Sequence, residues 1–306
     1  MAGDREIILH HYDTSPFSEK PRLLFGLHDL AWRSVIQPTI MPKPDLTPLT
    51  GGYRRAPVMQ IGADIFCDSQ VIMAEIRHRA GIGDPNDGLG WAVNLWSDRL
   101  FFQSSVAVIF GELGGAVPRA FIEDREKLMG RPFDVAAMKA AAAPMGAQWR
   151  AQAGWIETAL SGGAPYLRGD KPQIADVAAY MNIWFVTNFT PHLAGPLLDG
   201  FERLQAWRER MKAIGHGRRS EMTTAEALEI ARASEPNERI SHDPSDPLGL
   251  APGARVSVSA DDYGRDPISG RLVAANRERL TIAREDARHG HIHVHFPRAG
   301  YLVAAA

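Results

Sequence analysis

The sequence predicts three consecutive folding units: a mixed α/β domain over residues 1–82, an all-helical domain over 91–235, and a small all-β, barrel-like domain over 251–306. Two observations support this division. The hydrophobic pattern changes from mixed to helical and then to strand-like along the chain. Clusters of turn-forming residues at 84–88 and 236–252 separate the three patterns.

The first unit alternates short strands with helices, and a proline-rich loop interrupts it between residues 38 and 48. A turn containing glycine joins its last two strands into a hairpin. Gly81 follows the final helix and predicts its end. The expected elements are, in order, strand 7–9, helix 20–28, strand 35–36, strands 58–61 and 65–67, and helix 69–80.

The second unit is helical wherever its pattern is clear. Pro144 is expected to cut or kink one of its helices, because proline removes a backbone donor. A further helix is predicted over 224–233, since Thr223 and Glu226 have the spacing of a capping box. The other expected helices are 91–110, 122–129, 134–160, 174–187 and 201–211.

The third unit reverses the helical pattern. Short apolar runs separated by turns recur at intervals of about ten residues, which is typical of small antiparallel barrels. The expected strands are 256–259, 270–273, 280–282 and 291–296.

Composition excludes several classes of protein. With 45% hydrophobic and 23% charged residues, the chain has the composition of a soluble globular protein. The formal net charge of −2 provides no positive field for nucleic acid or anionic lipid. No apolar run approaches the ~20 residues of a membrane span, and the start of the chain is too charged for a signal peptide. We therefore expect a cytoplasmic protein with neither nucleic-acid nor membrane partners.

Residues 12–18, Tyr-Asp-Thr-Ser-Pro-Phe-Ser, lie between the first strand and the first helix. Such a turn directs backbone N–H groups and the positive end of the helix dipole at one point, which favours an anion. If the anion is a thiolate, a serine hydroxyl that donates to it lowers the pKa of the thiol. Ser15 and Ser18 fit helix N-caps equally well, so both interpretations stay open.

Two other segments point to an amino-acid or peptide ligand. In Ala56-Pro57-Val58, a cis proline at a strand entry would leave the N–H and C=O of the next residue free to pair with a peptide. Asp68-Ser69 offers a carboxylate and a hydroxyl at a helix start, which suits the ammonium and carboxylate of an amino acid. Ordinary helix capping explains this pair as well.

Together, Ser15-Pro16-Phe17-Ser18, Ala56-Pro57-Val58 and Asp68-Ser69, placed before a helical domain, resemble the glutathione S-transferase superfamily over about residues 5–215. The resemblance implies a thioredoxin-like domain that binds glutathione and a helical domain that forms most of the electrophile pocket. Residues 166–176 also resemble the family's loop and N-capping box. Here Gln173, a poor cap, stands at the cap position, and Asp176 is interpreted as structural.

The resemblance implies a serine-type enzyme in which Ser15 contacts the glutathione sulfur, with Tyr12 and Ser18 as alternatives. Because position 15 is serine and the single cysteine, Cys67, lies in an apolar strand, cysteine-type chemistry is not expected. The implied binding residues are Pro57 as the cis-proline, Val58 for the cysteinyl backbone, Asp68 and Ser69 for the γ-glutamyl group, and Arg55 near the glycyl carboxylate.

The resemblance implies a homodimeric transferase that conjugates the glutathione thiolate to a small hydrophobic electrophile. Trp96, Phe101, Phe102 and Val106 are candidates for the electrophile pocket, although such an aromatic stripe also fits a helical core. The same thiolate serves glutathione-dependent isomerases, lyases and peroxidases, which stay open. A different alternative is a non-catalytic scaffold whose C-terminal β domain binds a partner.

The C-terminal unit carries four of the 11 histidines of the chain, His289, His291, His293 and His295. On a strand, this spacing places them all on one face. Imidazoles so spaced suit Zn²⁺ or Ni²⁺. A polar outer face or a face that docks against another domain explains the pattern more simply, and we expect no metal site.

Overall fold

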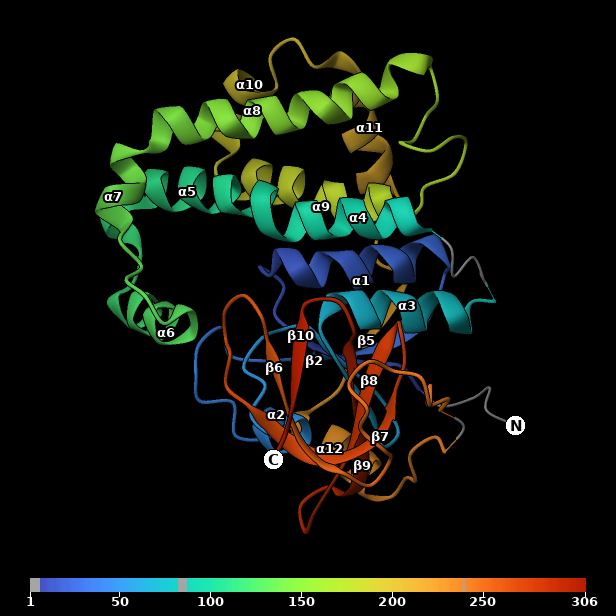
Figure 1. The fold of residues 1–306 in the computed structure, drawn as a ribbon. Helices are drawn as coiled ribbons and strands as arrows, with labels where there is room; N and C mark the ends of the chain where they lie inside the picture. Colours follow the sequence, from blue (N-terminus) through green and yellow to red (C-terminus); the bar gives the residue numbers. More distant parts are fainter. Residues whose placement is uncertain (1–5, 82–86, 239) are drawn as a thin grey trace.

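The computed structural model describes residues 6–81, 87–238 and 240–306 and contains one sheet of ten strands (Figure 1). The strand order is β10-β6-β7-β8-β9-β4-β3-β1-β2-β5. The strands are β1 (Ile8–His11), β2 (Ala31–Ile36), β3 (Val58–Ile61), β4 (Asp64–Cys67), β5 (Arg218–Glu221), β6 (Arg255–Ala260), β7 (Ile268–Ala275), β8 (Arg279–Asp286), β9 (Gly290–Pro297) and β10 (Tyr301–Ala305).

The N-terminal unit has the predicted order of elements. β1 pairs in parallel with β2 and antiparallel with β3, and β3 and β4 form the hairpin. Helices α1 (Pro16–Leu27) and α3 (Ser69–Arg79) lie between this sheet and the helical unit (Figure 1), and α2 (Leu46–Thr50) is one short turn within the proline-rich loop. α1 begins earlier than predicted, because Ser15 caps it and Pro16 occupies its first position, where no N–H is needed.

The helical unit contains α4 (Gly88–Trp96), α5 (Phe102–Leu113), α6 (Arg119–Met129), α7 (Val135–Ala140), α8 (Ala142–Ala159), α9 (Ile174–Phe189), α10 (Pro191–Leu198) and α11 (Glu202–Ala213). Of the linker predicted at 84–88, residues 84–86 lie outside the described residues, and Asp87 caps α4. The break expected near Pro144 falls at Ala141, so that the proline lies in the first turn of α8.

A π-helical turn, η1 (Ser97–Phe101), joins α4 to α5. The side chain of Asn182 in α9 donates to the Ser97 carbonyl and hydroxyl oxygens at 2.9 Å. The Ser105 hydroxyl in turn donates to Asn182 Oδ1 at 2.8 Å. The Ser97 carbonyl also accepts from the Phe102 N–H, so these side-chain bonds add to the pairing within the π turn and tie it to α9.

The chain returns to the N-terminal sheet after α11. β5 pairs in parallel with β2, and α12 (Thr224–Arg232) packs Ala227 against Ile8 and Val35. The predicted capping box is present, with Thr223 N–H donating to Glu226 at 2.8 Å. The sequence places residues 218–232 in the helical domain, but in the structure β5 extends the N-terminal sheet and α12 packs on it. α12 covers the apolar face of this sheet that α1 and α3 leave open.

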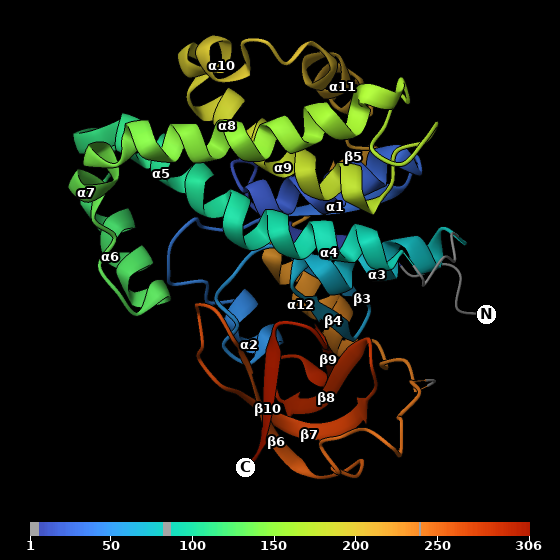
Figure 2. The same cartoon turned by 45° about the horizontal axis from the view of Figure 1, so that its top comes forward.

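The four predicted C-terminal strands are present as β6 to β9, and a fifth, β10, which the sequence analysis did not predict, pairs with β6 to give the antiparallel order β10-β6-β7-β8-β9. β9 also pairs in parallel with β4, which joins these strands to the N-terminal sheet. Their apolar side chains share one core with residues of the first unit, among them Leu46, Leu49, Tyr53 and Ile65. Figure 2 shows the C-terminal strands at the end of the molecule away from the helical unit, with α12 between them and that unit.

No helix within the described residues is long and apolar enough to cross a membrane.

Candidate functional site

The β1–α1 turn places Ser15 at the N-cap of α1. Its Oγ accepts a hydrogen bond from the Ser18 N–H at 3.2 Å, so the capping interpretation holds. The accepting hydroxyl keeps its own proton for donation to another group. Ser15 is only 1% exposed. Ser18 is fully buried, and its hydroxyl has no hydrogen-bond partner among the described residues.

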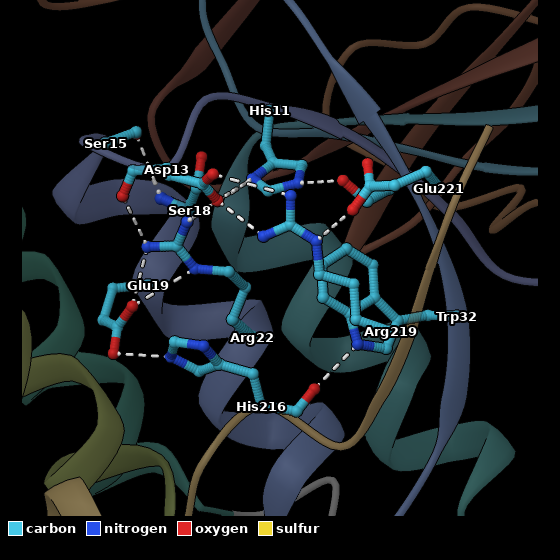
Figure 3. A network of polar contacts seen from close by, with 11 residues as sticks. His11, Asp13, Ser15, Ser18, Glu19, Arg22, Trp32, His216, Arg219 and Glu221 are labelled. Carbon is cyan, nitrogen blue, oxygen red and sulfur yellow. Dashed lines mark hydrogen bonds and ion pairs between the residues drawn. The ribbon is translucent and has the colours of Figure 1, made fainter. Parts of the chain in front are cut away.

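A polar network, buried at Glu19 and Arg22 and exposed at Asp13 and His216, holds this turn in place (Figure 3). The Arg22 guanidinium donates to the Asp13 carbonyl at 3.0 Å and to Glu19 Oε2 at 2.7 Å. His216, from the loop after α11, lies 3.0 Å from the other Glu19 oxygen. Arg219 of β5 donates to Asp13 at 2.7 Å. The returning segment after α11 therefore fixes the turn that carries Ser15.

The Ala56–Pro57 peptide is cis, as the sequence predicts, and leads into β3. Val58, the first residue of β3, is opposite His10 of β1 and Cys67 of β4 in the sheet. Pro57 and the Val58 side chain are buried.

Asp68 caps α3 in an unusual backbone conformation. Its φ of +96° is rare for a residue other than glycine and costs about 1–3 kcal/mol. Oδ1 accepts from the Gln70 N–H at 2.8 Å, and Oδ2 accepts from the Tyr301 hydroxyl at 3.1 Å. Ser69 beside it is buried. The strained backbone of Asp68 marks this residue, and with it the carboxylate, as a functional candidate.

Arg55 lines the same small cavity as Asp68, which we call the groove, and its side chain is already paired. Its guanidinium donates to Asp262, in the loop between β6 and β7, and lies 4.0 Å from the centroid of the Tyr263 ring. Arg55 and Asp68 line a small cavity of about 40 Å³ together with Asp262, Tyr263 and Tyr301. Residues of the C-terminal unit therefore complete the site, which no local sequence pattern indicated.

A second, apolar cavity of about 270 Å³ adjoins this groove, between the β1–α1 turn and the helical unit. Tyr12, Phe102 and Val106 line it, together with Phe17, Phe110, Phe121, Phe133 and Phe189. Trp96 and Phe101 stack on each other at 5.0 Å within the helical region and do not line the cavity. Two of the four residues considered for the electrophile pocket are thus brought to it.

Cations gather at one end of the apolar cavity, and the sequence analysis missed them. Lys43, which is only 4% exposed, donates to the Arg54 carbonyl at 2.9 Å. Burial, aided by the nearby Arg125, lowers the Lys43 pKa to about 8. Arg54 and Arg125 share the carboxylate of Asp124, at 3.0 and 2.6 Å. This end of the cavity carries an excess of positive charge that suits a carboxylate.

The second half of β9, which carries His293 and His295, packs against β4. His295 Nε2 lies 3.0 Å from Asp64 of β4, and its ring stacks on Phe66 at 4.4 Å. His291 remains exposed. Within residues 6–81, 87–238 and 240–306, no three His, Cys, Asp or Glu side chains are arranged to hold a metal ion. The pattern is explained by pairing of β9 with β4.

Asp176 is structural, as expected. Its carboxylate accepts from the Gln173 N–H at 3.0 Å, the Leu167 N–H at 2.8 Å and the Trp207 indole at 2.8 Å. Burial raises its pKa above the ordinary value. The residue ties the loop before α9 to α11.

Two family models match the chain. The glutathione S-transferase N-terminal domain matches residues 9–85, and the C-terminal domain matches residues 139–210. No curated protein matches the chain significantly.

Among solved structures, a GST-like protein from Pseudomonas syringae is 35% identical with a TM-score of 0.80, over 98% of this chain and all of that one. The likeness therefore includes the C-terminal strands. More distant likenesses show the fold alone. FzlA from C. crescentus is 22% identical, with a TM-score of 0.50 over 68% of this chain and 88% of its own. A Ser13Cys mutant of poplar glutathione transferase F1 is 13% identical, with a TM-score of 0.53 over 74% and 98%. This chain belongs to the glutathione S-transferase family.

Proposed function

We propose that the protein is a serine-type glutathione transferase that joins the glutathione sulfur to a small hydrophobic electrophile. Family membership supports glutathione-dependent transfer. One observation carries the assignment to this chain: the strained Asp68 carboxylate, Arg55 and the start of α1 surround a groove that adjoins an apolar cavity.

In this proposal, the β1–α1 turn stabilises the thiolate. Only a small fraction of free thiol is ionised at neutral pH, and the thiolate is the nucleophile. The Ser15 oxygen accepts from the Ser18 N–H, and this cap does not use the hydroxyl proton, which can be donated to the sulfur. The positive end of the α1 dipole adds to the stabilisation. The thiol loses its proton to solvent, and the sulfur attacks the electrophile held in the apolar cavity. As the carbon–sulfur bond forms, either a leaving group departs to solvent with its electron pair, or a conjugated double bond takes the pair and then a proton from water.

The remaining roles follow from the positions of the binding residues. Asp68 and Ser69 would hold the γ-glutamyl group, and Val58 would pair with the cysteinyl backbone beside cis-Pro57. Arg55 would receive the glycyl carboxylate, with Lys43 as a second cation on that side. Phe102 and Val106 would contact the electrophile.

Calorimetric titration with glutathione tests the binding site. We expect a dissociation constant between micromolar and millimolar, worth about 4–8 kcal/mol, and loss of binding in Asp68→Ala. Asp134→Ala is the matched control, because Asp134 also caps a helix, α7, but lines neither of the two cavities described. Equal binding by the wild type and Asp68→Ala would refute the assignment of Asp68.

Ultraviolet difference spectra of bound glutathione test the thiolate donor. Ser15→Ala should reduce the thiolate absorbance while binding stays nearly intact. If absorbance is unchanged in Ser15→Ala but falls in Tyr12→Phe, the donor is Tyr12, which lines the cavity. If neither substitution reduces it, Ser18 is the remaining hydroxyl to test.

A homodimer completes the proposal. Four large apolar side chains of the helical unit are more than 40% exposed: Leu89, Leu95, Leu100 and Trp155. Light scattering on the purified protein measures the mass in solution, and a monomer would refute this part.

The non-catalytic scaffold is the second candidate, and one observation favours it. Arg55 and Asp68 are both bonded to residues of the C-terminal unit. Glutathione binding without turnover of any electrophile, isomerisation or peroxide substrate would support the scaffold.

A further inference from the structure

The loop between β6 and β7 reaches into the groove proposed for glutathione. Its Asp262 carboxylate pairs with Arg55, and its Tyr263 ring covers the same guanidinium at 4.0 Å. Arg55 is the residue that would receive a ligand carboxylate. The loop therefore presents to Arg55 the same chemical group that glutathione would bring.

Contacts with both other units hold the loop in place. Asp261 accepts from Arg99 of η1 in the helical unit. The Gly264 N–H donates to the Leu128 carbonyl of α6 at 2.7 Å. The φ of +58° at Gly264 favours glycine, and a Cβ there would also lie 2.9 Å from a Leu128 methyl and 3.1 Å from Arg55, so these side chains would have to shift. The position of the loop is thus specified by side chains and backbone.

The groove has no room for glutathione with the loop in this position. The cavity between Arg55 and Asp68 measures about 40 Å³, whereas sites for small molecules usually measure about 300–1,000 Å³. Asp262 and Tyr263 form part of its wall. Arg55 also lines the apolar cavity of about 270 Å³, but Asp68 does not. A tripeptide that spans from Arg55 to Asp68 must therefore move Asp262 and Tyr263.

The contact is of a kind that a ligand can replace. The Asp262 side chain is 27% exposed, so water weakens its pairing with Arg55. A glycyl carboxylate would restore the ion pair that the loop gives up. The exchange leaves Arg55 paired in both states, which avoids a buried unpaired charge.

We propose that Asp262 is an internal ligand of Arg55, and that glutathione binds by displacing the β6–β7 loop. This inference rests on the glutathione site proposed above. The loop then sets the affinity of the site, because binding is weakened by the fraction of molecules in which the groove is closed.

The test is calorimetric titration of the full chain with glutathione, using wild type, Asp262→Asn and Asp266→Asn. Asp266 is an exposed carboxylate of the same loop that lines none of the cavities described and serves as the matched control. We expect Asp262→Asn to bind glutathione on the order of tenfold more tightly, and Asp266→Asn to bind as the wild type does. In the wild type, saturating glutathione should also speed amide hydrogen exchange at residues 261–265.

Each other result overturns the inference in a distinguishable way. Equal binding by wild type and Asp262→Asn means that the loop does not compete, and the glutathione site stands. Weaker binding by Asp262→Asn means that Asp262 contacts glutathione directly. Absence of binding in all three proteins rejects the glutathione site as well, since opening the groove does not admit the tripeptide.

Discussion

Acid is expected to destabilise the protein through two adjacent histidines at the end of β1. His10 Nε2 lies 2.9 Å from Gln60 Oε1, an acceptor, so it carries the proton, and Nδ1 faces the Gln37 amide at 3.4 Å. His11 Nε2 lies 3.1 Å from Ser34 Oγ, and its Nδ1 faces Arg22 at 3.4 Å (Figure 3). In each imidazole ring, a second proton on Nδ1 would point at a hydrogen-bond donor, the Gln37 amide or the Arg22 guanidinium.

These surroundings lower the pKa of both rings. Burial lowers the His10 pKa to about 4. Burial and then the Arg22 charge lower the His11 pKa to about 3. Because the folded pKa lies below the unfolded value of 6.5, stability is present above pH 6.5 and is lost as pH falls toward these values. Between pH 7.5 and 5.0, each histidine should remove about 2 kcal/mol from the free energy of unfolding.

Urea denaturation at pH 7.5 and 5.0 measures this loss. Other buried groups also titrate, so the informative quantity is the difference between wild type and His10→Gln. The variant should lose about 2 kcal/mol less than the wild type over this interval. NMR titration of the His10 ring gives its pKa independently.

Two results would refute this reasoning. If wild type and His10→Gln lose the same stability, His10 does not carry the acid sensitivity. If the His10 ring titrates near 6.5 in the folded protein, its hydrogen bonds do not oppose protonation.

Three further predictions concern the stability of buried polar contacts and the binding of ligands in the apolar cavity. Lys20 forms an ion pair with the Asp98 carboxylate at 2.6 Å, and Lys20→Met leaves this carboxylate without its cation. The free energy of unfolding in urea should fall by about 3–5 kcal/mol, and a loss below about 1 kcal/mol would contradict this. Asp176→Ala leaves the buried Trp207 indole and two part-buried backbone N–H groups without an acceptor and should cost about 3 kcal/mol, measured by calorimetric melting; an unchanged Tm would contradict it. Phe110→Trp adds bulk to the cavity wall and should weaken binding of an apolar fluorescent dye; unchanged dye binding would place the dye elsewhere.

Local features of the site could be read from the sequence because they depend on neighbouring residues. The N-cap interpretation of Ser15 agrees with the start of α1 at Pro16, although periodicity placed the helix from residue 20, and Asp68-Ser69 predicts the start of α3. The Thr223 capping box is of the same kind. Lys43 escaped notice because a lysine in a proline-rich loop carries no signal until the loop folds over the cavity.

The sequence by itself determined most of the order of strands and helices, without β5 and β10, and the motifs that indicate the family, because periodicity and capping act over a few residues. Only the tertiary structure decided that β9 joins β4, that β5 and α12 return to the first sheet, and that Asp262 pairs with Arg55. Strand edges offer the same backbone donors and acceptors whatever their sequence. Pairings between residues some 200 positions apart therefore depend on which edge and which charge the assembled fold leaves within reach.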